Sequence, residues 1–103
     1  MNKHIDELNK KLKFAFSCIQ NNNHLEAIKI YEEILTENQN NFDANSNLGM
    51  LYAQHNNLEK SEEYLNKAIE IDPKNPYAFN NLASILIKLG KNEEAVKFSQ
   101  VAI

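Results

Sequence analysis

Two asparagines, Asn47 and Asn81, stand 34 residues apart in the chain. A side-chain amide donates and accepts hydrogen bonds, so it can pair with both polar groups of one peptide unit. Each such bond contributes about 1 kcal/mol net in water. Two amides at a regular spacing could therefore hold an extended polypeptide by its backbone without reading its sequence. Because asparagine is abundant in this chain, solvated side chains without a ligand are the alternative interpretation.

The three histidines, His4, His24 and His55, are the residues that most often bind metal ions. None has a second histidine at i+4 or the carboxylate context that zinc sites use. Histidines near turns are usually exposed polar residues. We therefore predict no metal site in this chain.

The single cysteine, Cys18, could be imagined as a nucleophile with His24 as its base. Its equivalents 34 and 68 residues later are Tyr52 and Leu86, which indicates a core position instead. The chain has two glycines, too few for a phosphate-binding loop. We predict no catalytic residues and no cofactor.

The 34-residue interval recurs along the chain and defines the elements that position these side chains. Small residues occur at Ala27, Ser61 and Ala95. Further columns with the same spacing are Ala15, Gly49 and Ala83; Phe14, Leu48 and Leu82; and Leu35, Ile69 and Ile103. A fixed period of this length predicts stacked helical hairpins, in which small residues let the two helices approach closely. Function is then expected on a surface rather than in a deep pocket.

Apolar periodicity and turn residues place the helices at about residues 4–21, 42–55, 58–71, 76–89 and from 92 onward, with another that begins after Asn23 and runs through Leu35. Asn22, Asn56 and Gly90 are one period apart, and each tolerates the left-handed backbone that ends a helix. Asn23 stands three residues before Glu26, as in a capping box. Asn75 fits an N-cap, and Pro76 fits a first helical position.

The residues at fixed places in each repeat carry a family resemblance. With Leu8, Phe42 and Pro76 as first positions, the middle repeat has Leu48-Gly49, Tyr52, Ala68 and Asp72-Pro73, and the third has Phe79, Leu82-Ala83, Gly90, Glu94-Ala95 and Ala102. This pattern resembles the tetratricopeptide repeat family from Leu8 to Ile103. The first repeat departs from it, with Lys11 in the aromatic slot, Ala15 for the glycine and Gln39 for the closing proline.

The resemblance implies an all-α fold, a right-handed α-solenoid of three antiparallel helix hairpins. The chain would be one domain, residues 1–103, with repeats at about 8–41, 42–75 and 76–103, the last of them truncated. In this family the first helices of the hairpins line a concave groove that binds an extended peptide. The candidate peptide-binding residues are Asn47, Asn81, Lys13, Phe16, Met50, Tyr77, Asn80, Ser84 and Lys88.

Two particular uses of the groove can be compared with these residues. The segment Asn80-Asn81-Leu82-Ala83 is similar to the asparagine-ladder repeats of O-linked N-acetylglucosamine transferases and kinesin light chains, although Lys13 takes the corresponding place in the first repeat. The carboxylate clamp of heat-shock co-chaperones is not matched, because only Asn47 agrees with it. A terminal carboxylate would find no cationic partners there.

Composition limits the compartment and the partners. The net charge is -3 and the pI about 5.6, which disfavours a nucleic-acid partner. No apolar stretch approaches the roughly 18 residues of a membrane span, and the polar start has no secretory core. We expect an intracellular, cytoplasmic protein without disulfides that has no membrane partner.

Three functions remain open at this stage. The first is an adaptor that binds a protein or peptide in its groove. The second is a scaffold that forms a homodimer through an uncapped C-terminal helix with Phe98, Val101 and Ile103, since repeat arrays normally need a polar cap. The third is the targeting region of a larger enzyme, because the chain ends inside its last predicted helix and can be a fragment.

Overall fold

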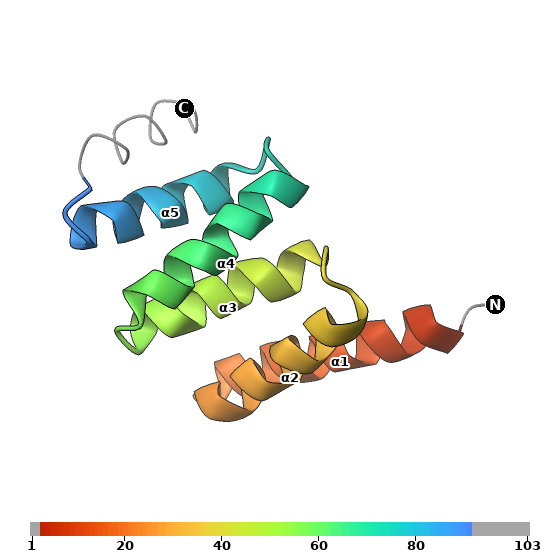
Figure 1. Ribbon diagram of the computed structural model, residues 1–103. Coiled ribbons are helices and arrows are strands. Elements are labelled where there is room, and N and C mark those ends of the chain that lie inside the picture. Colours follow the sequence, from red (N-terminus) through yellow and green to blue (C-terminus); the bar gives the residue numbers. More distant parts are fainter. Residues whose placement is uncertain (1–2, 92–103) are drawn as a thin grey trace.

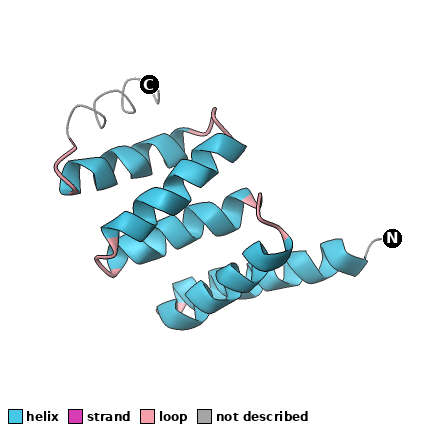
Figure 2. Cartoon of the chain, viewed as in Figure 1, coloured by secondary structure: helices cyan, strands magenta, loops and turns pink. Residues whose placement is uncertain are grey.

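The computed structural model describes residues 3–91, which form five α-helices joined by short turns (Figure 1). The helices are α1 (Lys3–Gln20), α2 (His24–Glu37), α3 (Phe42–Gln54), α4 (Leu58–Ile71) and α5 (Pro76–Lys88). Within this range there is no strand (Figure 2). The expected boundaries of α1, α3, α4 and α5 are confirmed to about one residue. The helix expected from residue 92, with Phe98, Val101 and Ile103, lies outside the described residues.

Each helix packs against the next one in the chain, so the hairpins form a stack rather than a bundle. The contacts follow the order α1–α2–α3–α4–α5, and α3 also touches α5 (Figure 1). The stack is elongated, with extents of 45 × 28 × 20 Å. This arrangement is the all-α solenoid of antiparallel hairpins that the repeat predicts.

The turns within the hairpins repeat the same backbone geometry. Asn22 and Asn56 have φ angles of 60° and 63°, and Gly90 has 82°. After α1, the N–H of Asn23 donates to the Cys18 carbonyl at 2.7 Å; after α3, Asn57 donates to Tyr52 at 2.8 Å; after α5, Lys91 donates to Leu86 at 2.7 Å. These six-to-one bonds around a left-handed residue define a Schellman motif. The predicted threefold recurrence of one tight turn is confirmed.

Helices α3 and α4 lie close together at Gly49. An ideal Cβ built on Gly49 would lie 2.6 Å from Cγ of Leu65, well inside van der Waals contact. The hydroxyl of Ser61 donates to the Gly49 carbonyl at 2.7 Å across the same contact. Ser61, Ala27 and Ala15 are all fully buried. The small-residue columns therefore have the packing role that the sequence predicts.

The core follows the stack as two clusters of buried side chains. The first joins α1, α2 and α3 and contains Ala15, Cys18, Ala27, Ile30, Tyr31, Ile34, Ala44, Leu48 and Leu51. The second joins α4 and α5 and contains Leu65, Leu82, Ala83, Ile85 and Leu86. Because the helices α1 to α5 bury their apolar faces against one another, they hold their relative positions.

Asparagine side chains cap three of the four helices α2 to α5. The side chains of Asn41, Asn57 and Asn75 accept hydrogen bonds from backbone N–H groups of α3, α4 and α5. Asn23 stands at the N-cap of α2 but makes no such side-chain bond. The capping-box expectation for Asn23 is therefore wrong. Asn57 follows the same Schellman turn and does cap α4 with its side chain, so the two starts differ only in this side-chain bond.

Phe14 also departs from its column. Leu48 and Leu82 are fully buried, whereas Phe14 is 57% exposed. Leu48 belongs to the cluster that includes α2, the helix preceding its own, and no described helix precedes α1. The column thus predicts burial only where an earlier hairpin covers it.

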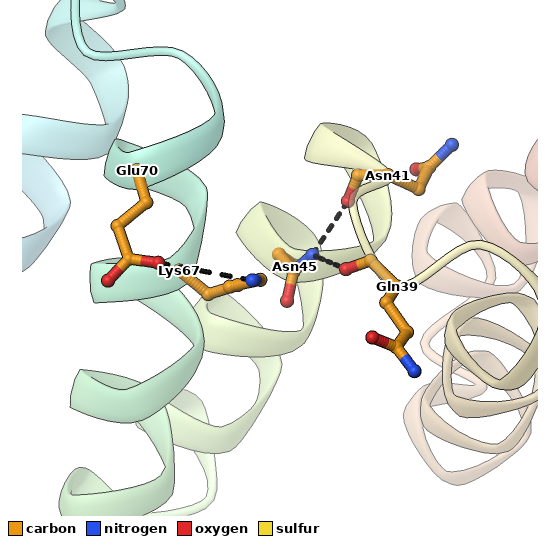
Figure 3. A network of polar contacts seen from close by, with 5 residues as sticks. All are labelled: Gln39, Asn41, Asn45, Lys67 and Glu70. Carbon is orange, nitrogen blue, oxygen red and sulfur yellow. Dashed lines mark hydrogen bonds and ion pairs between the residues drawn. The ribbon is translucent and has the colours of Figure 1, made fainter.

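The slot that holds Phe79 in the third repeat holds Asn45 in the second, and Asn45 is 2% exposed. Its Nδ2 donates to the carbonyls of Gln39 at 3.1 Å and Asn41 at 2.9 Å, so the amide ties α3 to the loop before it (Figure 3). An exposed pair, Lys67 and Glu70, lies on the neighbouring α4 with 3.9 Å between Nζ and Oε2 (Figure 3). Asn45 therefore replaces aromatic packing with loop hydrogen bonds.

Candidate functional site

Helices α1, α3 and α5 form one side of the stack, which we call the inner wall, and two hollows lie along it. The first hollow has a volume of about 350 Å³ and is lined by Leu12, Lys13, Phe16, Tyr31, Asp43 and Asn47. The second has a volume of about 180 Å³ and is lined by Met50, Ala53, Gln54, Leu65, Asn81, Ser84, Ile85 and Lys88. Both are open and shallow, as expected for a surface that contacts a chain rather than a small molecule.

The structure brings seven of the nine candidate residues to these hollows. The first hollow contains Lys13, Phe16 and Asn47. The second contains Met50, Asn81, Ser84 and Lys88. The other two, Tyr77 and Asn80, are exposed on α5 and line neither hollow.

Asn47 is held in place by a neighbouring helix. Its Nδ2 donates to the Oη of Tyr31 on α2 at 3.1 Å. Tyr31 is 1% exposed, and burial raises its pKa to about 12, with a further contribution from the nearby Asp43 carboxylate. The hydroxyl therefore stays protonated at neutral pH. Asn47 keeps its carbonyl oxygen and one amide hydrogen for a ligand.

Asn81 is in a different state from Asn47. Its side chain is half-buried on α5, and within residues 3–91 it forms no hydrogen bond to another residue. The amide borders the apolar side chains of Met50 and Ile85 in the second hollow. Its full set of two donors and one acceptor is thus available at a partly desolvated position.

The two hollows combine apolar surface with a few charges. Phe16 is 54% exposed in the first hollow, where Lys13 and Asp43 supply one charge of each sign. In the second hollow, Met50 supplies the apolar side chain and Lys88 a positive charge. Apolar side chains that stay exposed beside amides suit a ligand with alternating side chains and backbone groups.

Seven of the fourteen residues that line the hollows were not among the candidates, and two of these seven lie outside α1, α3 and α5. Tyr31 belongs to α2 and Leu65 to α4, so both come from the second helix of a hairpin. They are one period apart, 34 residues, and this spacing is the signal that could have found them. Each closes the floor of one hollow between two neighbouring helices of the inner wall.

The other candidate chemistry has a different outcome. Cys18 is 5% exposed within the core cluster, as expected, so its thiol is not available as a nucleophile. Among the described residues, no three His, Cys, Asp or Glu side chains gather as metal ligands. His24 and His55 are nevertheless paired, with 3.3 Å between Nδ1 and Nε2. The i, i+4 rule did not indicate this pair because its members are 31 residues apart.

None of the helices formed by residues 3–91 has the length and apolarity to cross a bilayer.

Comparisons with known proteins agree with this architecture. Two sequence profiles described as tetratricopeptide repeat match residues 19–78 and 64–97. The photosystem I assembly protein Ycf3 of Rippkaea orientalis is 31% identical over 87 residues, which cover 75% of this chain and 50% of that protein. The chain therefore spans half the length of this relative.

Several solved structures share the fold. The type III secretion chaperone SycD of Yersinia enterocolitica, in complex with a peptide of the translocator YopD, has a TM-score of 0.89 at 18% identity, covering 94% of this chain and 74% of that one. The second repeat domain of Spaghetti (RPAP3), bound to an HSP90 peptide, has a TM-score of 0.87 at 20% identity, covering 92% and 88%. The O-GlcNAc transferase of Thermobaculum terrenum has a TM-score of 0.92 at 20% identity, covering 99% and 20%.

The stacked hairpins and the repeated turns define a helical repeat protein. The profile matches define it more closely: the chain belongs to the tetratricopeptide repeat family. Arrays of this family are protein–protein interaction modules, and their extended concave surfaces are the binding sites.

Proposed function

We propose that this protein binds an extended segment of a partner protein along its inner wall and performs no catalysis itself. The observation that carries the proposal is the position of the two hollows, each with a half-buried asparagine beside an apolar side chain. Backbone groups of the segment pair with the amides, and its side chains enter the hollows. SycD and Spaghetti, which share the fold, were solved with bound peptides, and this supports the proposal.

Asn47 and Asn81 are the proposed backbone contacts. Phe16 and Met50 are proposed to take apolar side chains of the partner, and Lys13, Ser84 and Lys88 to contact its polar groups. Tyr77 and Asn80, which lie outside the hollows, would contact only the end of a longer segment. We also propose that residues 1–103 form a single domain and that the protein is intracellular.

The experiment selects binding decapeptides from a random phage-displayed library and measures their Kd by fluorescence anisotropy. Asn81→Ala is the cleaner variant, because its amide has no partner among residues 3–91. Removing both Asn47 and Asn81 loses at least two hydrogen bonds, about 2 kcal/mol, and raises Kd about 30-fold. Asn66→Ala on α4 is the matched control, since Asn66 is exposed and lines neither hollow.

The result distinguishes contacts made by the two asparagines from binding at other parts of the stack. An unaltered Kd in the double variant removes the asparagines from the proposal. Equal losses in the double variant and in Asn66→Ala would place binding elsewhere on the stack. Asn47→Ala also removes the partner of the Tyr31 hydroxyl, so its unfolding midpoint is measured beside Kd to separate the two effects.

Self-association is the second candidate function, and exposed Phe14 on α1 favours it. The equivalent residues Leu48 and Leu82 are fully buried, so the array could be continued by a helix placed on α1. Light scattering of the wild type and of Phe14→Ser tests this candidate. A dimer that dissociates in the variant supports it, and a monomer across micromolar concentrations excludes it. A third role, as the targeting region of a larger enzyme, is tested by the full-length sequence of the protein.

A further inference from the structure

Two imidazoles from neighbouring hairpins meet at one edge of the stack. His24 is the first residue of α2, and His55 is the C-cap residue of α3. Nδ1 of His24 lies 3.3 Å from Nε2 of His55, and the ring centroids are 5.4 Å apart with the planes at 89°. His24 is partly exposed and His55 is exposed, so ions in solution can reach both. Neither residue lines a hollow of the inner wall.

The backbone holds both histidines next to well-defined turns. His24 follows the Schellman turn at Asn22, and His55 precedes the one at Asn56. The bonds that close these turns, Asn23 to Cys18 and Asn57 to Tyr52, measure 2.7 and 2.8 Å. The two side chains are therefore brought together by the stacking of hairpins and need no ligand for it. Preorganised donors of this kind bind a metal ion without the cost of ordering a loop.

The separation of the two nitrogens fits tetrahedral zinc. With Zn–N bonds of about 2.0 to 2.1 Å, two imidazole nitrogens on a tetrahedral ion are about 3.3 to 3.4 Å apart. The observed distance is 3.3 Å. Ligands at right angles, as in square-planar or octahedral sites, would be about 2.8 to 3.0 Å apart at the same bond length.

We propose that His24 and His55 form a two-histidine site for a divalent transition metal ion, Zn²⁺ by preference, which links the first hairpin to the second. The ion takes the place of the hydrogen bond between the rings. The shared proton moves to the outer nitrogen of its own ring, so two neutral imidazoles bind without a net loss of protons.

Two protein ligands leave two positions of the tetrahedron open. Among the described residues, no third His, Cys, Asp or Glu side chain completes a metal-binding group here. Water occupies these positions, or a donor atom of a bound protein does. Such a site binds reversibly and is more labile than closed structural zinc sites, which have four protein ligands. Oxygen-seeking ions such as Mg²⁺ find no suitable donors.

The test follows the three histidines of the chain by NMR during titration with ZnCl₂, in protein prepared without a polyhistidine tag. The imidazole signals of His24 and His55 are expected to shift together and to saturate at one equivalent of Zn²⁺, while those of His4 do not. At a free Zn²⁺ concentration of ten times Kd, the folded-to-unfolded ratio rises about elevenfold, so Tm increases. MgCl₂ is expected to change neither observable.

Two variants and one control complete the experiment. The variants His24→Gln and His55→Gln each place an uncharged polar side chain at an accessible position. Both are expected to lose the saturable shift and the rise in Tm. His4→Gln is expected to retain both. The proposal is overturned if all three histidines shift in parallel without saturation, or if His24→Gln keeps the wild-type response to Zn²⁺.

Discussion

The close approach of α3 and α4 at Gly49 makes Gly49→Ala the sharpest test of the packing. A Cβ at this position would lie 2.6 and 2.7 Å from Cγ and Cδ2 of Leu65, where carbon atoms normally stay about 3.5 to 4.0 Å apart. Leu65 is 1% exposed and cannot turn away into solvent. Overpacking of this kind costs about 1 to 3 kcal/mol.

An opposing effect must be subtracted from this cost. Alanine is about 1 kcal/mol more favourable than glycine inside a helix, so the variant gains that amount from its backbone. The net result is a loss of up to about 2 kcal/mol. For a domain of this size, Tm falls by about 4 to 8 °C per kcal/mol. Circular dichroism during heating and urea denaturation measures both quantities.

A double-mutant cycle with Leu65→Ala identifies the clash as the cause. Truncation of Leu65 removes the atoms that the new Cβ would meet, so Gly49→Ala should then stabilise the protein by about 1 kcal/mol. All four proteins are compared in one sucrose-containing buffer, because Leu65→Ala alone costs about 2 to 5 kcal/mol. If Gly49→Ala stabilises the wild-type protein by as much as it stabilises the Leu65→Ala protein, the account of hairpin packing is refuted.

Three further predictions concern single positions. Burial raises the pKa of Tyr31 to about 12, against about 10 in the unfolded chain. The contribution of its protonated hydroxyl to the free energy of unfolding is therefore complete below pH 10 and falls by up to about 3 kcal/mol as the pH rises through 12. Tyr31→Phe should flatten this part of the profile of unfolding free energy against pH. Asn45→Ala leaves the Gln39 carbonyl without its amide donor and should lower the urea midpoint, at unchanged m, by the equivalent of about 2 kcal/mol. At Asn56, with φ of 63°, substitution by Gly should be tolerated while Ala loses about 1 kcal/mol; equal Tm values for the two variants would contradict the left-handed turn.

Local rules predicted much of the fold. Asn and Gly readily adopt the left-handed backbone that ends a helix, so the turns at Asn22, Asn56 and Gly90, one period apart, could be placed from the sequence. The fully buried Ala27 and Ser61 likewise follow from the need for close helix approach. These features depend on residues near one another in the chain.

Features that depend on a neighbouring hairpin could not be predicted in the same way. Phe14 is exposed because burial of its column requires a preceding helix, which the column alone does not supply. The hydrogen bond from Asn47 to Tyr31 joins two helices whose side-chain positions follow from the stacking offset. The pairing of His24 with His55 has the same origin, since the residues are not equivalent in the repeat.

The most direct test of the central claim is a ¹⁵N NMR titration of the protein with a selected decapeptide. We predict that the largest amide shifts gather on residues of α1, α3 and α5 that line the two hollows, with Asn81 and its neighbours among the first to move. Asn66 on α4 should stay unchanged. Shifts concentrated on α2 and α4, with the inner wall unaffected, would contradict the account.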